Sequence, residues 1–366
     1  MSFLKNIFGS QKEEPISNYT DFWQWFQLNE KMFRKTIGNA QRMEQEFFNK
    51  LSPKLDQLHK DIYMLAGMSD AGTVELILTP EGRIHNFVFV EDLVAAAPPI
   101  DGWKFTALKP ALGFQGMAIK MGAYSFNENT LSFYSNDDPN YPDMIDITIV
   151  HTDYRENNKQ EIMNGVFIYL DNVLGEEKSI LVLDNVDFAS RPPQGKELIP
   201  ITKLVDYITW REKEFVEKYE ATWFEVGDGN YAIMEGINPA GEKIIASMNT
   251  ELLDWDAKAS HPWILHLEVK YDGRSRNGMP DEETISLTND IVDEMSDQLK
   301  DKEGYLWVGR KTGMNSREIY FACKEFRKPS RMAYAIQQKY SKQLHLEYTI
   351  FKDKYWFSLK QYRNHN

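Results

Sequence analysis

Residues 263–299 constrain the fold of this chain more than any other stretch. They begin with an apolar, β-rich run at 263–269, which is typical of a buried strand. The dipeptides Asp272-Gly273 and Asn277-Gly278 follow, and both favour a tight reversal of the backbone. The sequence therefore predicts a strand that ends in an exposed loop.

The helix expected after this loop has clear start signals. Pro280 suits the first turn, because the N–H group that proline lacks would have no partner there. Three carboxylates at 281–283 oppose the positive end of the helix dipole. Apolar side chains then recur at helical spacing as far as Leu299. We predict a helix over residues 280–299.

The rest of the second half completes a known order of elements. The predicted elements are strands at 305–311 and 317–325, a helix at 329–340 and a last strand at 344–351. The order β-α-β-β-α-β is that of the split βαβ, or ferredoxin-like, arrangement. In that arrangement the helices cover one face of the sheet, so we expect the other face to be open to a partner.

Residues 71–190 show a similar order. The predicted elements are strands at 73–79, 101–108, 130–135, 144–152 and 179–188 and helices at 84–97 and 159–174. We interpret them as a second, diverged ferredoxin-like module. The predicted fold class is thus α+β, with two antiparallel-sheet modules. Four segments are expected: an N-terminal helical hairpin (1–70), the first module (71–190), a linker helix with a short β-meander (191–260) and the second module (261–366).

The N-terminal helical hairpin allows two interpretations. One helix is expected to start near Thr20, and a second to run to Ala66, with apolar residues at heptad spacing along 48–65. The hairpin could pack on its own domain, or it could form a homodimer through a coiled coil. The pattern spans fewer than four heptads, which favours packing within the domain.

Charge and cysteine content limit the class of function. The 366 residues carry a net charge of −13, although residues 262–366 hold 18 Lys and Arg against 15 Asp and Glu. A broadly acidic chain is poorly suited to coat a phosphate backbone. Cys323 is the only cysteine, so a disulfide within the chain is excluded, and we expect a cytoplasmic protein. No run of 18 apolar residues predicts a membrane span.

Several motifs of the second half carry a family resemblance. The most specific is Asn277-Gly-Met-Pro-Asp-Glu-Glu283, and Trp223 with the segments 231–237, 308–312 and 317–321 adds to it. On these residues, the stretch from about 220 to 360 resembles the bacterial domain of unknown function 695 family. That family is similar in fold to the ribonuclease E inhibitor B-like proteins, which are small, acidic, ferredoxin-like regulators that bind a partner protein. The resemblance implies regulation by binding rather than catalysis.

Motifs for catalysis or metal binding are not evident in the sequence. None of the seven histidines has HExxH, HxH or HxxxH spacing, and Cys323 has no second cysteine beside it. We therefore expect no catalytic residue, no cofactor and no metal site. One alternative stays open, a metal-dependent hydrolase in which the carboxylates of 281–283 bind a divalent cation together with Asp272 or Asp290.

A third interpretation is binding of single-stranded RNA by the second module. Arginines near the predicted loops could meet phosphates while strand aromatics stack on bases. The residues concerned are Arg274, Arg276, Arg310, Lys311 and Arg317 with Tyr305, Trp307, Tyr320 and Phe321. The signature of an RNA-recognition motif is absent from the sequence, and nucleic acid is the less favoured partner.

The leading hypothesis is a regulatory protein that acts through contacts with another protein. The loop at 274–276 and the helix start at 280–283 would form one contact surface, with acidic side chains meeting a basic partner. The predicted partner-binding residues are Arg274, Arg276, Asn277, Asp281, Glu282, Glu283, Arg310 and Arg317.

Overall fold

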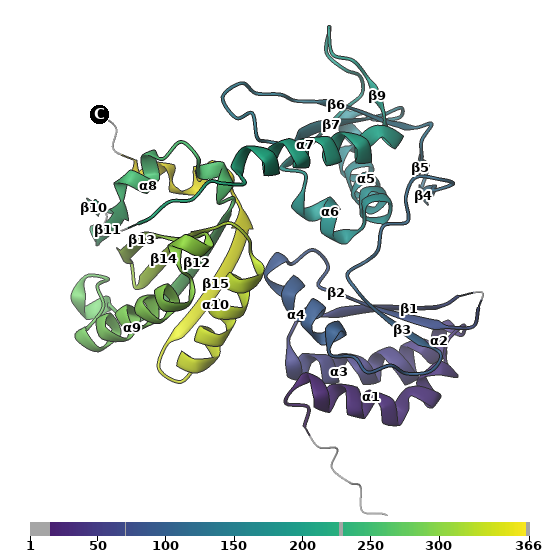
Figure 1. Ribbon diagram of the computed structural model, residues 1–366, viewed down its shortest axis with the longest axis horizontal. Helices are drawn as coiled ribbons and strands as arrows, with labels where there is room; N and C mark the ends of the chain where they lie inside the picture. Colours follow the sequence, from purple (N-terminus) through teal and green to yellow (C-terminus); the bar gives the residue numbers. More distant parts are fainter. Residues whose placement is uncertain (1–14, 70, 227–229, 364–366) are drawn as a thin grey trace, which may run out of the picture. The chain divides into compact units, whose positions relative to one another are not determined.

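The computed structural model describes residues 15–69, 71–226 and 230–363, and the chain divides into two compact units (Figure 1). One unit comprises residues 1–81 and 89–109, and the other comprises 82–88 and 110–366. The turn predicted at 227–229 lies outside the described residues. Within the described part of the chain, no helix is both long enough and apolar enough to cross a bilayer.

The first unit is built on a three-stranded sheet with the order β1-β2-β3. Its elements are α1 (Tyr19–Arg34), α2 (Ala40–Arg42), η1 (Met43–Phe48), α3 (Asn49–Leu58), β1 (Tyr63–Met68), β2 (Val74–Thr79) and β3 (Trp103–Ala107), with the part of α4 (Ile84–Ala95) from residue 89 on. β1 is antiparallel to β2, and β3 is parallel to it. Aromatic side chains of α1 pack on β3, with the Trp23 and Phe105 ring centroids 4.5 Å apart.

The second predicted N-terminal helix is shorter than expected. α3 ends at Leu58, His59 is extended, and Asp61 has a φ of 62°. Residues Tyr63–Met68 then form β1, because pairing with β2 overrides the helical spacing of Leu65. The aromatic residues Phe22, Phe26 and Phe33 of α1 are fully buried. A homodimer through these helices stays a prediction.

The second unit begins with a four-stranded sheet with the order β8-β7-β6-β9. Its elements are β4 (Ile119–Met121), β5 (Tyr124–Phe126), β6 (Leu131–Ser135), β7 (Asp146–His151), η2 (Glu156–Asn158), α5 (Lys159–Leu174), α6 (Glu176–Leu181), β8 (Asn185–Ala189), β9 (Ile199–Pro200), η3 (Ile201–Lys203) and α7 (Leu204–Tyr219). Side chains of the sheet, α5 and α7 share one apolar core, which includes Phe133, Val166 and Leu204.

The strands of 71–190 therefore do not form one split sheet, in contrast to the prediction. β2 and β3 are direct parallel neighbours in one sheet, and β7 and β8 are direct parallel neighbours in another. A split βαβ unit needs an antiparallel strand between the two parallel ones. Neither β2 and β3 nor β7 and β8 have such a strand between them. The strand predicted at 179–188 is also shorter, because α6 occupies 176–181.

The second half of this unit is a six-stranded antiparallel sheet with the order β10-β11-β13-β14-β12-β15 (Figure 1). Its elements are β10 (Tyr231–Ile237), β11 (Lys243–Asn249), α8 (Thr250–Asp254), η4 (Lys258–Ser260), β12 (Trp263–Lys270), η5 (Arg274–Arg276), α9 (Glu282–Gln298), η6 (Asp301–Glu303), β13 (Tyr305–Gly313), β14 (Ser316–Cys323), α10 (Arg327–Tyr340), β15 (His345–Lys352) and η7 (Phe357–Tyr362). The β-meander predicted as a separate segment joins this sheet through β10 and β11, and residues 222–226 form no strand.

Both faces of the six-stranded sheet carry apolar layers. On the face opposite α9 and α10, Ile264, Leu306 and Ala322 pack against Trp356 and Leu359 of the C-terminal segment. The face that was expected to be open is therefore partly covered, because the chain turns back after β15 and forms η7. Cys323 lies fully buried in β14, where burial raises the pKa of its thiol well above the usual range.

Candidate functional site

The loop between β12 and α9, residues 271–281, is tied to the tip of the β13–β14 hairpin. The backbone N–H of Tyr271 donates to Asn315 O (3.0 Å), and the N–H of Gly273 donates to Asn315 Oδ1 (3.0 Å). The N–H of Asn315 donates back to Gly278 O (3.0 Å), and the Tyr271 hydroxyl donates to Ser316 O (2.9 Å). These bonds hold the loop, so its side chains have defined positions.

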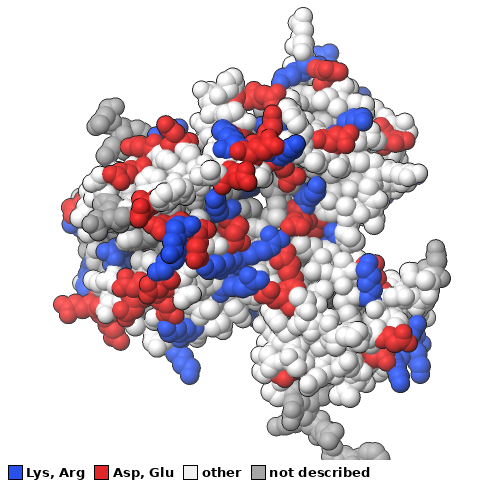
Figure 2. All heavy atoms as spheres, viewed as in Figure 1, with Lys and Arg blue, Asp and Glu red and all other residues white. Residues whose placement is uncertain are grey.

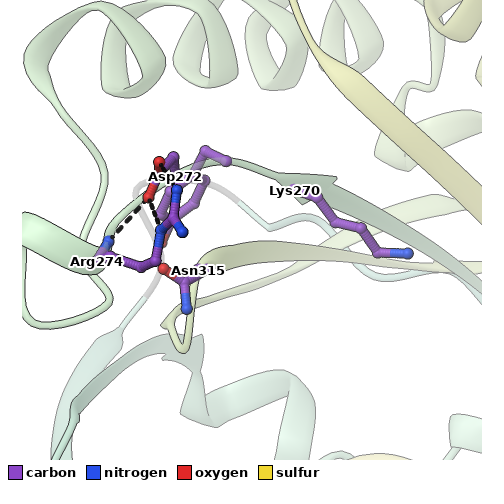
Figure 3. Close-up of a pocket in the computed structure, with 5 residues that line it drawn as sticks. Lys270, Asp272, Arg274 and Asn315 are labelled. Carbon is purple, nitrogen blue, oxygen red and sulfur yellow. Dashed lines mark hydrogen bonds and ion pairs between the residues drawn. The ribbon is translucent and has the colours of Figure 1, made fainter.

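A shallow pocket of about 470 Å³ opens beside this loop (Figure 3). Its lining residues are Lys270, Tyr271, Asp272, Arg274 and Asn315. Arg274 makes a two-point contact with Asp272, with Nε–Oδ1 2.9 Å and Nη2–Oδ2 2.6 Å. Hydrogen bonds from Arg274 hold the pKa of the Asp272 carboxyl well below its usual range. Asp272 and Arg274 are thus paired within the loop, whereas Lys270 pairs with Glu347 of β15.

The start of α9 follows the expected chemistry. Asp281 is the N-cap, and its Oδ1 accepts a hydrogen bond from the N–H of Thr284 (2.8 Å). The side-chain hydrogen bond with Thr284 is the main cause that lowers the pKa of Asp281, and this backbone bond adds to it. The guanidinium of Arg276 lies 3.3 Å from Asp281 Oδ2. Glu282 and Glu283 point their carboxylates into solvent.

These acids do not assemble a cation site in the described part of the chain. Among the residues with defined positions, no group of three or more His, Cys, Asp or Glu side chains lies close enough together to hold a metal ion. Asp272 is engaged by Arg274, and Asp281 is engaged as the helix cap. The arrangement therefore gives the hydrolase alternative no support.

Arg310 and Arg317, also predicted to bind a partner, form no hydrogen bond or ion pair with the described side chains of the loop. Arg317 is only 6% exposed and lies beneath α9, where its Nη1 donates to Thr288 Oγ1 (2.6 Å). Its Nε donates to Thr312 Oγ1 (3.0 Å). Arg310, from β13, is half-buried and donates to Asn289 Oδ1 (2.7 Å). The eight predicted residues thus form two groups rather than one surface.

The aromatic residues proposed as a platform for bases are mostly inside the protein. Tyr305 and Tyr320 are each 7% exposed, and Phe321 is fully buried. Lys311 is engaged by Glu318, with Nζ–Oε1 2.6 Å. On the face drawn in Figure 2, acidic and basic side chains are interleaved, without a broad patch of one sign. This surface does not favour stacking or phosphate tracking along an RNA strand.

The edge strand β10 is a candidate binding feature that was not singled out from the sequence. Ile233 is 72% exposed and Ile237 is 76% exposed, although both are strong strand formers. The end of β10 adjoins the loop, because a Cβ placed at Gly278 would lie 3.5 Å from Glu242 Oε1 in the β10–β11 turn. The alternation of apolar residues in 231–237 was the available signal, but the edge position comes only from the sheet order.

A second pocket of about 300 Å³ was also missed by sequence reasoning. Aromatic rings form much of its wall, and the buried Lys258 lies 5.9 Å above the Trp356 ring. Burial lowers the pKa of the Lys258 ammonium to about 8. The lining residues come from three distant segments: Asn140, Tyr141, Leu253, Trp255, Asp256, Lys258, Tyr355, Trp356, Phe357, Leu359, Lys360 and Arg363. No local pattern could have united them.

Comparison with protein families matches one part of the chain. Residues 237–362 match the model of a family described as a family of unknown function (DUF695). The match covers roughly a third of the 366 residues, and it includes the loop, α9, Arg310 and Arg317. Trp223 and most of β10 lie before it. Comparisons with curated proteins and with solved structures gave no match.

Proposed function

We propose that this chain is a binding protein that recognises an extended segment of another protein along β10. The observation that carries the proposal is the exposure of Ile233 and Ile237 on a strand with one free edge. The free edge of a strand presents backbone N–H and C=O groups that can pair with a strand from another chain. Exposed isoleucines on that strand would add apolar contact with alternate side chains of the partner.

The opposite edge of the same sheet is protected against such pairing. β15 exposes His345 and Glu347, whose side chains lie 3.1 Å apart, and Glu347 also pairs with Lys270 (2.6 Å). Charged side chains on an edge strand disfavour addition of a further strand. On β10, in contrast, Glu235 is paired with Lys243 of the neighbouring strand (2.9 Å) and lies between two exposed isoleucines. The asymmetry favours β10 as the docking edge.

The loop and the start of α9 would supply specificity beside this edge. Arg274 extends into solvent, with a side chain that is 84% exposed, and Glu282 and Glu283 are exposed on the first turn of α9. Exposed charges at the rim of an interface select partners and speed association more than they add affinity. We propose that they meet complementary charges of the partner, with the acidic pair facing basic side chains.

We propose a cytoplasmic regulator whose β12, β13, β14 and β15 with α9 and α10 adopt a ferredoxin-like arrangement, similar to the ribonuclease E inhibitor B-like proteins. The strand order β13-β14-β12-β15 and the helix after β12 and after β14 support this arrangement.

A capture experiment with the full chain tests the docking edge. The wild type, an Ile233→Lys/Ile237→Lys variant and a control Leu28→Lys variant would be used as bait in extracts of the source cells. Leu28 is 87% exposed on α1, so the control also replaces an exposed apolar side chain. We expect proteins that bind the wild type and the control but are lost with the double variant.

Hydrogen exchange on the captured complex locates the contact. Pairing of a partner strand would slow exchange of backbone amides in 231–237. The proposal would be overturned if the double variant retained every binding protein, or if exchange in β10 were unchanged in the complex. Sedimentation of the chain alone distinguishes a foreign partner from a second copy, because self-pairing through β10 would give a dimer that the double variant loses.

A further inference from the structure

The buried Arg317 and the half-buried Arg310 of the six-stranded sheet share one neutral acceptor. Asn289 Oδ1 accepts from Arg310 Nη1 (2.7 Å) and from Arg317 Nη1 (3.5 Å). Arg310 comes from β13 and Arg317 from β14, and Asn289 belongs to α9. The two guanidinium groups therefore meet at a single amide oxygen below the helix.

Among the described residues, none of the hydrogen-bond partners of these guanidinium groups bears a negative charge. Arg317 contacts the hydroxyls of Thr288 and Thr312, and Arg310 contacts only Asn289. Within the described residues, no carboxylate forms an ion pair with either arginine. The exposed Arg274, by contrast, has a carboxylate partner in Asp272.

This arrangement of two arginines without a counter-charge destabilises the folded protein when no ligand is bound. A buried charge is normally matched by an opposite charge, and two like charges at close range repel each other. Burial, reinforced by the nearby Arg310, lowers the pKa of Arg317 to about 10. The Nη2 group of Arg317 and the Nε and Nη2 groups of Arg310 have no acceptor among the described residues. With the second N–H of Arg310 Nη1, six N–H donors are thus left for a ligand.

We propose that Arg310 and Arg317 form a binding site for a dianionic phosphate group. Two positive charges match the charge of a phosphate dianion, and guanidinium groups bind its oxygens with paired N–H donors. Arg310 is half-buried, so the ligand would reach the site past the exposed part of this side chain. This site is independent of the docking edge on β10.

The test uses inorganic phosphate as the probe and the full chain as the protein. Calorimetric titration and thermal unfolding would compare the wild type with Arg310→Gln, with Asn289→Asp and with the control Arg274→Gln. We expect phosphate to raise the Tm of the wild type by about 5 °C at ~100 times its Kd. Arg310→Gln should weaken phosphate binding by about tenfold or more, which corresponds to the loss of a charge-assisted bond.

Asn289→Asp provides the sharper variant, because it builds a counter-charge at the atom where both arginines already meet. We expect this variant to have a higher Tm than the wild type without phosphate and to lose most of the phosphate effect. Arg274→Gln should bind phosphate as the wild type does.

Three results would overturn the proposal. One is an equal phosphate-induced rise of Tm in the wild type and in Arg310→Gln, which would reveal a general salt effect. Another is a loss of phosphate binding in Arg274→Gln as large as in Arg310→Gln, which would place the anion at the loop. The third is acetate binding as tight as phosphate binding, which would show that no dianion is selected.

Discussion

Lys354 Nζ lies 2.7 Å from Asp184 Oδ2, and the two side chains are only 4% and 5% exposed. Lys352 Nζ reaches the other oxygen of the same carboxylate, also at 2.7 Å. Burial lowers the pKa of Lys352 to about 8, although Asp184 partly compensates. One acid that precedes β8 therefore holds two lysines from the end of β15 and the segment after it. This contact joins the four-stranded and the six-stranded sheets of the second unit.

Replacing Asp184 by Asn should be strongly destabilising. The change leaves two lysines buried without a counter-charge, and breaking a buried ion pair from one side costs about 3–5 kcal/mol. Denaturant unfolding of the full chain measures the loss. Asp206→Asn is the matched control, because its pair with Lys203 is 3.2 Å long but exposed, and such pairs contribute ~0–1 kcal/mol. Similar losses in both variants would contradict the prediction.

The buried His261 should make stability depend on pH below neutrality. Its ring is fully buried, the Ser260 hydroxyl donates to Ala257 O, and the Nδ1–H of His261 therefore donates to Ser260 Oγ (2.8 Å). Nε2 has no partner. Burial, with a contribution from Lys324, lowers the pKa of His261 to about 4 from its usual 6.5.

Between pH 6.5 and 4, His261 is therefore protonated in the unfolded chain but stays neutral in the folded protein. The free energy of unfolding should fall by up to about 3 kcal/mol as the pH drops through this window, and this group should have no effect above pH 7. Unfolding curves recorded every half pH unit would show the slope. In His261→Asn the slope should shrink by roughly that amount, and an unchanged slope would refute the assignment.

The N-cap of α9 should contribute through its hydrogen bond more than through its charge. Asp281→Ala removes the acceptor for the N–H of Thr284 and should cost about 1 kcal/mol. Asp281→Asn keeps an acceptor while it removes the 3.3 Å ion pair with Arg276, which is exposed and weak. We expect Asn to restore most of the stability in thermal unfolding. Equal losses in the two variants would show that the charge dominates.

Gly278 should tolerate no side chain, for two separable reasons. Its φ is +79°, and an added Cβ would lie 3.0 Å from the backbone nitrogen of Met314. Gly195 has a similar φ of +87° with nothing within 4 Å of the added atom. Gly195→Ala should therefore cost about 1 kcal/mol for the backbone alone, and Gly278→Ala about 1–3 kcal/mol more. Equal costs would show that the loop yields to the added methyl group.

Elements with local signals were predicted closely from the sequence. α5 spans Lys159–Leu174 as expected, with Gly175 at its end, because the helical period and the stop residue lie within the segment itself. α9 was also predicted to within two residues at its start, since Pro280 and Asp281 mark that start.

The predictions that were wrong concern contacts between residues far apart in the chain. Residues 63–68 form a strand because they pair with β2. Residues 231–249 belong to the six-stranded sheet because β11 pairs with β13. For the same reason, sequence reasoning placed Arg317 on a surface, whereas α9 covers it. Burial of a polar side chain is a property of the packed sheet and not of its own segment.

Cys323 is the sole thiol of the sequence and is buried in a central strand of the six-stranded sheet. The rate at which this thiol reacts therefore measures how often the sheet opens. A sulfhydryl reagent can modify it only in molecules whose strands have come apart. The mass added to the chain over time would thus count opening events at one defined place, in the natural sequence and without an introduced label.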